Sequence, residues 1–322
     1  MQLGGARVIS TPRHYAYLKI AEGCNNGCYY CAIPLIRGAL RSREINDCVA
    51  EARWLAGEGV RELILVAQDP TAYGEDWGRP GAICELLDRL QEIDGIRWIR
   101  ILYAYPERIS DAFIAAMVRN TKVVPYLDLP IQHCDDAVLK AMNRRGGRKE
   151  IEDAIARLRA AIPGITLRTT LIAGFPGETE EDFQKTLRVV EEARFASAFT
   201  FIYSPRPGTP AAEMEQVPHD VVQDRFERLV ALQERITEEN LKTFEGRDVE
   251  VMVTGASGKK DAATHRVTGR EKTGVLVHVG VPEGEPMPQV GDFVTATITH
   301  AGRHNLIADP DPKAGQTYAV RH

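Results

Sequence analysis

Six short apolar runs alternate with helical patterns over the first two thirds of the chain, and this alternation restricts the possible folds more than any other feature. The runs cover residues 15–23, 61–69, 97–106, 123–132, 166–175 and 197–204. Strands that alternate with helices at this spacing form parallel sheets joined by right-handed crossovers. The six units therefore predict an α/β fold with a partial (β/α) barrel, in which chemistry gathers at the carboxyl ends of the strands.

Several of the intervening segments carry helix signals. Ile45, Val49, Ala52 and Leu55 recur at three- and four-residue steps, which places them on one helical face. Thr179, with Asp182 three residues later, is typical of a capping box that begins a helix. A long helix is predicted over 218–246, with an apolar face of Val222, Phe226, Leu229, Leu232 and Ile236.

The pattern changes after this long helix. From Arg247 onward, short alternating runs are separated by Gly and Pro, which predicts a small antiparallel β-barrel that binds a partner on one face. The predicted organisation is a linker over 1–12, a barrel over 13–244, a small β-barrel over 245–310 and a tail over 311–322.

Composition narrows the class of partner. The 322 residues are 44% hydrophobic and 26% charged, with a net charge of -5, so no overall basic field attracts nucleic acid. No run approaches the eighteen or so apolar residues of a membrane span, and the start MQLGGARVISTPRH lacks the apolar core of a secretory signal. These features predict a cytoplasmic protein without a membrane partner.

Cys24, Cys28 and Cys31 lie directly after the first apolar run, at a C-x3-C-x2-C spacing. A disulfide uses an even number of cysteines, and a structural zinc site normally takes four ligands. Three thiolates within eight residues suit a metal centre that leaves one coordination position for another group.

Other interpretations of the three thiols are a zinc loop completed by a distant ligand, a redox pair of Cys28 and Cys31, and coincidence. The clustering argues against coincidence, and a redox C-x-x-C normally opens a helix in a thioredoxin-like unit. Zinc remains the rival, since thiolates suit zinc and iron–sulfur chemistry alike. Tyr30, directly before the last cysteine, and the position after the first strand favour iron and sulfur.

A C-x3-C-x-aromatic-C run after the first barrel strand resembles the radical S-adenosylmethionine (SAM) enzymes. The resemblance implies that Cys24, Cys28 and Cys31 hold three irons of a 4Fe–4S cluster, and that SAM binds the fourth iron. It also implies a radical reaction at an unactivated carbon, in which the cofactor carries the chemistry and the protein supplies position and shelter. An electron donor such as flavodoxin or ferredoxin is then expected as a partner.

Longer motifs are similar to those of the methylthiotransferases within this superfamily, over essentially the whole chain, and the tail resembles a TRAM domain. The motifs are TPRHYAYLKIAEGC, IPLIRGALRSR, LVAQDPTAYG, PYLDLPIQHCDDAVLKAMNRRG, LRTTLIAGFPGETEEDF and FIYSPRPGTPAA. Complete members of this family have an amino-terminal domain with three more cysteines and a second 4Fe–4S cluster. No cysteine precedes Cys24, and Cys48, Cys84 and Cys134 are widely dispersed. The expectation is that this chain lacks that domain, binds one cluster and cleaves SAM without completing methylthiolation.

Two branches of the family differ in substrate. The VAQD and LPIQH runs favour the branch that modifies an aspartate of the S-twelve protein of the small ribosomal subunit. Residues 245–309 carry seven Lys and Arg against nine Asp and Glu, and an RNA-binding barrel would need the opposite balance. We therefore predict S-twelve as the substrate. The alternatives are an adenosine of transfer RNA and, in a different class, a zinc-binding adaptor without catalysis.

Cofactor-binding candidates follow the strands. The run Thr170–Glu178 resembles the family's fifth-strand motif, with Thr170 in place of a glycine, so Ile172 is expected to pack on adenine and Gly174 to allow its close approach. Gln68 and Gln132 end the second and fourth strands, where their amides are expected to bind the methionyl or ribose part. The cofactor-binding candidates are Tyr30, Gln68, Gln132, Arg168, Ile172 and Gly174.

Arg168 is expected to pair with a cofactor carboxylate or to form a structural ion pair. His133 and Arg206 are the predicted substrate contacts, His133 at the barrel mouth beside Cys134 and Arg206 in the loop SPRPGTP. A structural histidine and a rigid turn are their alternatives. Cys48 and Cys84 are predicted to be packing thiols.

Overall fold

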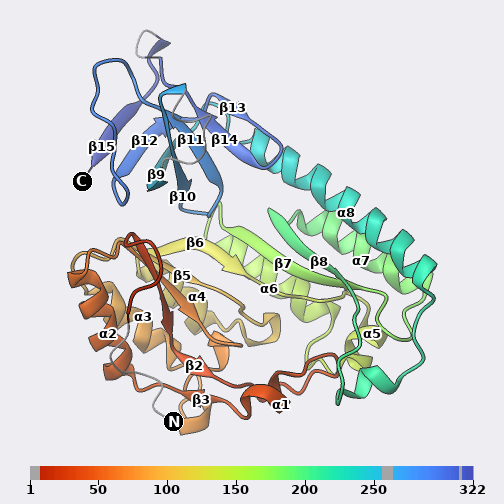
Figure 1. Cartoon of the computed structure of the whole chain (residues 1–322). Helices are drawn as coiled ribbons and strands as arrows, with labels where there is room; N and C mark the ends of the chain where they lie inside the picture. The colour runs from red at the N-terminus through yellow and green to blue at the C-terminus, as the bar shows by residue number, and fades with distance from the viewer. Residues whose placement is uncertain (1–7, 256–263, 312–313, 322) are drawn as a thin grey trace.

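A computed structural model describes residues 8–255, 264–311 and 314–321 and shows the predicted parallel sheet. Its six strands lie in the order β1-β4-β5-β6-β7-β8, and each pairs in parallel with the next (Figure 1). Each of the six apolar runs contains one of them: β1 (Tyr15–Lys19), β4 (Glu62–Val66), β5 (Trp98–Ile101), β6 (Val123–Asp128), β7 (Thr166–Ala173) and β8 (Ser197–Ile202). The predicted α/β barrel class is confirmed.

Helices cover one face of this sheet and leave the other face open (Figure 1). The helices are α1 (Ile33–Arg37), α2 (Ile45–Gly57), α3 (Ile83–Gln91), α4 (Asp111–Arg119), α5 (Asp136–Ala141), α6 (Arg148–Ala161), α7 (Glu180–Ala193) and α8 (His219–Lys242). Short 3-10 turns are η1 (Pro70–Ala72), η2 (Glu75–Trp77), η3 (Pro106–Arg108) and η4 (Pro210–Glu213). In α2 the four predicted apolar positions are buried, and Thr179 and Asp182 form the predicted capping box of α7.

The two faces of each strand carry different side chains. In β4, Leu63 and Leu65 are fully buried against the helices, whereas Glu62 and Ile64 line a cavity on the open face. This alternation follows from the two-residue period of a strand. The open face is the barrel lumen, the space that the curved sheet encloses.

The long helix α8 buries Val222, Leu229 and Ile236 as predicted. Phe226 and Leu232, predicted on the same face, are only half-buried. Arg225 and Gln233 take the intervening buried positions because their polar ends find partners, Glu178 for Arg225 and the carbonyl of Phe195 for Gln233. The helical spacing of apolar residues alone cannot identify buried polar positions of this kind.

The C-terminal region forms a seven-stranded sheet in the order β13-β14-β11-β10-β9-β12-β15. Its strands are β9 (Asp248–Gly255), β10 (Arg266–Glu271), β11 (Leu276–Gly280), β12 (Phe293–Thr297), β13 (His300–Ala301), β14 (Asn305–Ala308) and β15 (Tyr318–Arg321). All neighbours are antiparallel except β11 and β14. The predicted domain limits remain a prediction, and part of the predicted linker and tail lies outside the described residues.

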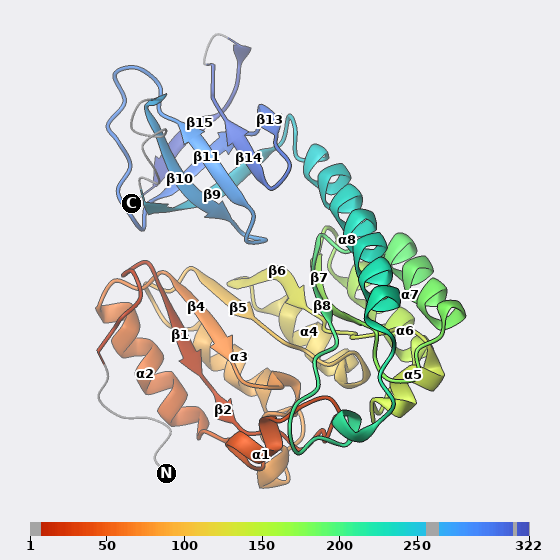
Figure 2. The ribbon, with the colours of Figure 1, turned by 45° about the vertical axis from the view of Figure 1, so that its right-hand side comes forward.

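The C-terminal sheet sits over the amino-terminal ends of the barrel strands, and α8 runs from the barrel toward it (Figure 2). Trp98 of β5 and Phe293 of β12 stack edge to face with centroids 5.1 Å apart, and Arg97 lies 4.3 Å over the Phe293 ring. Arg97 also pairs with Glu250. The carboxyl ends of the barrel strands therefore remain uncovered by the C-terminal sheet.

Candidate functional site

The three clustered cysteines lie on the loop between β2 (Ala21–Glu22) and α1, at the carboxyl end of β1. All three are free thiols; Cys28 is buried, and Cys24 and Cys31 are half-buried. Burial raises the pKa of Cys24, while the backbone N–H of Asn26, which donates to Cys24 Sγ at 3.5 Å, opposes that rise. Burial likewise raises the pKa of Cys31 against a hydrogen bond from the backbone of Ile33. Such N–H to sulfur contacts are one of the ways a protein tunes an iron–sulfur site.

This thiol loop, residues 23–32, is held by the turn that follows α5. The backbone N–H of Tyr29 donates to the carbonyl of Met142 at 3.0 Å, and Asn143 Nδ2 donates to the carbonyl of Gly27 at 2.8 Å. Asn143 has φ +57°, a left-handed conformation that asparagine tolerates better than most residues. The turn after α5 therefore fixes the loop from one side.

A buried polar network fixes the loop from the other side. Asn26 Nδ2 donates to Asp69 Oδ2 at 3.0 Å, and Arg108 lies 3.2 Å from the same carboxylate and 3.2 Å from Asn26 Oδ1. Asp69 follows β4 and Arg108 ends η3, so the ends of neighbouring strands meet at the loop. Sequence reasoning missed this network, because its members are far apart in the chain.

The donor set fits an iron–sulfur cluster that binds through three thiolates. Within the described ranges, no three His, Cys, Asp or Glu side chains are already drawn together as metal ligands, so the test rests on donor chemistry. The other cysteines are not available: Cys48 and Cys134 are fully buried in the barrel core, and Cys84 packs against it from α3. Burial raises the pKa of Cys48 to about 11, as expected of a packing thiol. The loop thus offers three soft ligands and no fourth cysteine.

Two glutamines follow the carboxyl ends of β4 and β6, which lie on either side of β5 in the sheet. The carbonyl oxygen of Gln68 is buried without a hydrogen-bond partner among the described residues, while its amide lies 3.4 Å from Glu22. Gln132 is 8% exposed and has φ +68°, and its backbone pairs with β7 through Thr170 and Ile172. Strained backbone of this kind clusters at functional sites. Both positions accord with the predicted cofactor-binding role, which remains a prediction.

Arg168 is already paired. Its guanidinium forms a two-pronged ion pair with Asp128 of β6, and it lies 4.4 Å over the ring of Phe199. The structural ion pair considered from sequence is thus present, and the arrangement leaves Arg168 without a free charge for a cofactor carboxylate. Its position near the amino-terminal half of β7 also places it away from the thiol loop.

Gly174 and Ile172, at the end of β7, both pack against other parts of the chain. A Cβ atom on Gly174 would collide with both methyl groups of Val222 on α8, and Gly174 has φ +77°. The close approach that this glycine permits is therefore to a helix of the same chain. Ile172 is half-buried and packs beside a small cluster of Phe175 and Tyr203. An adenine contact through Ile172 remains a prediction.

His133 is buried, contrary to the exposure that a substrate contact requires. Its Nδ1 accepts from the backbone N–H of Asp135 at 3.0 Å, and its Nε2 lies 3.3 Å from Glu178 Oε2. Glu178 also accepts from the N–H of Gly174 at 3.0 Å and from Arg225 at 2.9 Å. The structural alternative considered for His133 explains these contacts, because its ring is one part of a buried network that joins β7 to α8.

Arg206 is exposed on the loop predicted at the substrate entrance. This loop lies against the thiol loop: the N–H of Ala211 donates to the carbonyl of Tyr29 at 3.1 Å, and a Cβ on Gly208 would lie 3.1 Å from Leu35 of α1. Tyr30 is near Cys28, and burial raises its pKa well above the ordinary value. The substrate role of Arg206 remains a prediction that its position allows.

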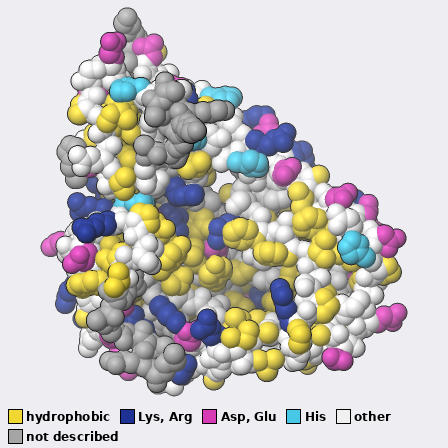
Figure 3. Space-filling view, in the orientation of Figure 1, with side chains coloured by type: hydrophobic (Ala, Val, Ile, Leu, Met, Phe, Trp, Pro, Cys, Tyr) yellow, Lys and Arg dark blue, Asp and Glu magenta, His cyan; other side chains and the backbone are white. Residues whose placement is uncertain are grey.

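A cavity of about 930 Å³ occupies the barrel lumen and runs up to the C-terminal sheet. Figure 3 shows apolar side chains gathered in the hollow between the two parts, with Lys and Arg around it. Tyr17, Tyr103, Phe199 and Phe201 on this open face are 39–53% exposed. Sequence reasoning missed these rings, although their alternation along the strands was a usable signal.

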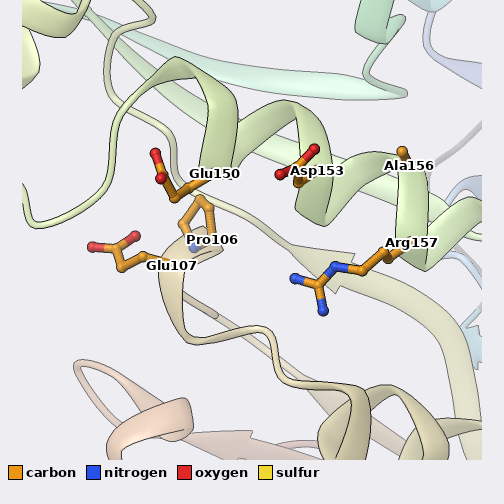
Figure 4. A pocket seen from close by; sticks show the side chains of 6 residues that line it. All are labelled: Pro106, Glu107, Glu150, Asp153, Ala156 and Arg157. Atoms are coloured by element: carbon orange, nitrogen blue, oxygen red, sulfur yellow. The ribbon is translucent and has the colours of Figure 1, made fainter.

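A smaller cavity of about 340 Å³ lies between η3 and α6 and has no thiol among its lining residues. Figure 4 shows Glu107 and Glu150 at one end and Arg157 at the other. Three carboxylates, of Glu107, Glu150 and Asp153, oppose one guanidinium here. This cavity is outside the barrel lumen and does not belong to the candidate site.

The family model described as the Radical SAM superfamily matches residues 18–190, which include the thiol loop and strands β4 to β7. The chain belongs to the radical SAM superfamily. Proteins of this superfamily use a 4Fe–4S cluster and SAM, so the predicted pair of cofactors is confirmed. The fold agrees with coproporphyrinogen III oxidase (HemN) of Escherichia coli, with a TM-score of 0.54 at 17% identity over 87% of this chain and 66% of that one.

The sequence relatives are methylthiotransferases. A tRNA-2-methylthio-N(6)-dimethylallyladenosine synthase of Bifidobacterium adolescentis is 64% identical over 95% of this chain and 64% of its own length. Six further relatives, 45–55% identical, carry the same name. A ribosomal protein uS12 methylthiotransferase RimO of Anaeromyxobacter is 46% identical over 94% of this chain and 64% of its own length. The chain spans 58–66% of the length of these relatives.

These names overturn the prediction of an S-twelve aspartate as substrate, and with it the ranking of nucleic acid as the less favoured partner. The motifs quoted for that branch did not discriminate between the two branches. The charge count was a poor guide because ion pairs and burial withdraw charges of both signs from a surface. Glu250 pairs with Arg97 and Lys272, Asp309 pairs with Arg266, and Glu271 is buried. The net charge of a domain therefore says little about the electrostatic field at any one of its surfaces.

Among the described residues, no helix is both long enough and apolar enough to cross a membrane.

Proposed function

We propose that this chain is the catalytic core of a methylthiotransferase that modifies an adenosine of transfer RNA, with Cys24, Cys28 and Cys31 holding its 4Fe–4S cluster. The observation that carries this proposal is the shared name of seven relatives at 45–64% identity, each of which matches over at least 91% of the chain. The thiol loop at the strand ends supplies the matching site.

The residues of the site each have a task in this proposal. The thiolates of the loop bind iron, and the open carboxyl ends of the strands leave room beside them for SAM. When bound, the cluster and SAM together supply a radical that can remove hydrogen from an unactivated carbon. Gln68, with its unpartnered buried carbonyl, and Gln132 orient the cofactor by hydrogen bonds. The walls of the barrel keep bulk water from the reacting carbon.

The lumen supports an RNA substrate. Exposed aromatic rings at Tyr17, Tyr103 and Phe199 offer faces on which unpaired bases stack, a contact that tolerates sequence. Arg270, which also lines this cavity near the C-terminal sheet, brings positive charge to it. A nucleotide extruded from a loop therefore meets planar aromatic faces in the barrel lumen.

The first experiment tests the metal site. After anaerobic reconstitution and reduction with dithionite, the chain with added SAM is expected to contain four irons and four sulfides and to release deoxyadenosine. Cys28→Ala is expected to lose iron and deoxyadenosine formation, whereas the matched control Cys84→Ala retains both. Zinc without iron or sulfide in the unaltered chain would reject the proposal in favour of a zinc-binding protein.

The second experiment tests the substrate. An anticodon stem-loop RNA with an N6-dimethylallyl adenosine is expected to bind, and its affinity is expected to fall steeply as salt rises, because phosphate contacts release counterions. A stem-loop of the same charge with the target adenosine replaced by uridine is the control. Equal binding of both RNAs, or no binding at low salt, would contradict a transfer-RNA adenosine as the substrate.

A further inference from the structure

Arg144 is a buried cation with one unused donor. The residue is 9% exposed, its Nη2 lies 3.3 Å from the carbonyl of Pro130, and its Nη1 has no hydrogen-bond partner among the described residues. Its guanidinium stacks 4.1 Å over the ring of Tyr105. Leaving a buried charged donor without a hydrogen bond costs free energy. The unpaired Nη1 therefore indicates either a missing ligand or a functional role for Arg144.

The backbone around Arg144 places it beneath the thiol loop. Met142 and Asn143 bind Tyr29 and Gly27 of that loop, and Arg145 lies 3.5 Å from the carbonyl of Asn25. The three residues around Arg144 in the chain thus touch the loop on both sides of Cys28. Arg144 itself has no role in the proposed function.

The charge of Arg144 is only weakly compensated. The carboxylate that pairs with it among the described residues is Glu107, at 3.5 Å from Nη2. Glu107 is turned partly into the outer cavity between η3 and α6 (Figure 4). Burial would lower the pKa of Arg144, but its electrostatic interactions with Tyr30, Glu107, Tyr105 and Cys28 raise it. The guanidinium therefore stays charged.

We propose that Arg144 raises the reduction potential of the cluster bound at Cys28, by holding a buried positive charge and a free N–H under the thiol loop. Reduction transfers one electron from a donor such as dithionite to the cluster, and no bond forms or breaks. The added negative charge is stabilised by a nearby cation, and the effect is large where water is excluded. Arg144 is thus a positioning residue, and the inference rests on the proposed ligand role of the three cysteines.

Two substitutions of opposite sign test this inference. Arg144→Met removes the charge, and Glu107→Gln removes the nearest acid. The reconstituted proteins are titrated with dithionite at controlled potentials, and the reduced cluster is counted by electron paramagnetic resonance. At the potential that half-reduces the unaltered protein, Arg144→Met is expected to lower the ratio of reduced to oxidised cluster at least tenfold, or about 59 mV for one electron. Glu107→Gln is expected to raise that ratio.

Arg119→Met is the matched control, since it makes the same chemical change on an exposed side chain of α4 that pairs with Asp88, and its midpoint is expected to be unchanged. If Arg144→Met binds no iron, Arg144→Lys replaces it and is expected to keep iron with a midpoint close to that of the unaltered protein. An unchanged midpoint in Arg144→Met, a drop in the ratio for Glu107→Gln, or loss of iron from Arg144→Lys would overturn the inference. Absence of iron from the unaltered chain would instead reject the proposed function.

Discussion

Val222 of α8 fills the space that a side chain at Gly174 would occupy. A Cβ atom built on Gly174 would lie 3.0 Å from the Val222 Cβ and closer still to both of its methyl groups. The backbone at the end of β7 therefore packs directly against a side chain at the start of α8. In the same region, Glu178 contacts both Arg225 and His133. The strand end beside the thiol loop is thus fixed by a helix that also reaches the C-terminal sheet.

Gly174→Ala is expected to destabilise the protein by about 2–4 kcal/mol. The left-handed backbone at φ +77° contributes about 1–2 kcal/mol, and the collision with Val222 contributes the rest. Urea denaturation gives the free energy of unfolding. The control is Gly164→Ala, at the same φ of +77° but with nothing within 4 Å, which isolates the backbone cost. Equal losses in both variants would show that packing against Val222 contributes nothing.

Phe199→Ala is expected to weaken binding of the anticodon stem-loop by about 5- to 150-fold, because stacking of one base is worth about 1–3 kcal/mol. Phe199 is 47% exposed on the lumen face of β8. Trp54→Ala is the control, since Trp54 is 41% exposed on α2, on the helical side of the sheet. Fluorescence anisotropy measures the dissociation constants. A loss of affinity in Trp54→Ala as large as in Phe199→Ala would argue against the lumen as the RNA channel.

Phe293→Ala is expected to loosen the C-terminal sheet from the barrel. The substitution removes the edge-to-face contact with Trp98 and the Arg97 cation over the ring, and losses for buried aromatic residues are about 3–5 kcal/mol. We expect faster proteolysis between Thr243 and Arg247 and an earlier first unfolding transition. Val290→Ala, at a 52% exposed position near the same strand, should change neither. Unaltered proteolysis of Phe293→Ala would refute this coupling.

The carboxylate of Glu180 makes stability depend on pH. Hydrogen bonds from Arg228 hold its pKa at about 2, against an ordinary value of 4.5. A lowered pKa means that the stabilising contribution is present above about pH 4.5 and is lost as pH falls from 4.5 toward 2. Because Glu180 is half exposed, the contribution is below about 1 kcal/mol.

Glu180→Gln is therefore expected to be less stable than the unaltered protein at pH 7, and this difference is expected to shrink as pH falls from 4.5 toward 2. Urea denaturation at several pH values measures this difference. Glu227→Gln, also a carboxylate of the α7–α8 region but bonded to Gln223, is the control. A Glu180→Gln difference that grows as pH falls would contradict the expected loss of this carboxylate's contribution in acid.

Much of the fold could be predicted because the relevant signals are local. The strand runs, the helical face of α2 and the capping box at Thr179 each depend on a few adjacent residues. The three thiols of Cys24, Cys28 and Cys31 are also a local signal, since they lie within eight residues. Their common loop could therefore be predicted from the sequence. The partners of His133 and Gly174, which are Glu178 and Val222, could not be predicted because they are set by packing between separate elements.

The choice of substrate shows a different limit. A sum of charges over residues 245–309 treats every charged side chain as available to a ligand, whereas Glu250 is paired with Arg97 and Asp309 with Arg266. Which charges remain free is a property of three-dimensional pairing and cannot be read from composition.

The sequence by itself determined the order of strands and helices, the break before the C-terminal strands and the spacing of three thiols, since each depends on neighbours along the chain. Tertiary structure alone decided which charges and rings face the lumen and which side chains brace the thiol loop. It placed Asn143 under Gly27 of the thiol loop, residues more than a hundred positions apart, and buried the neighbouring Arg144. The physical reason is that burial and ion pairing depend on which residues are close in space, and the order of residues along the chain does not give these distances.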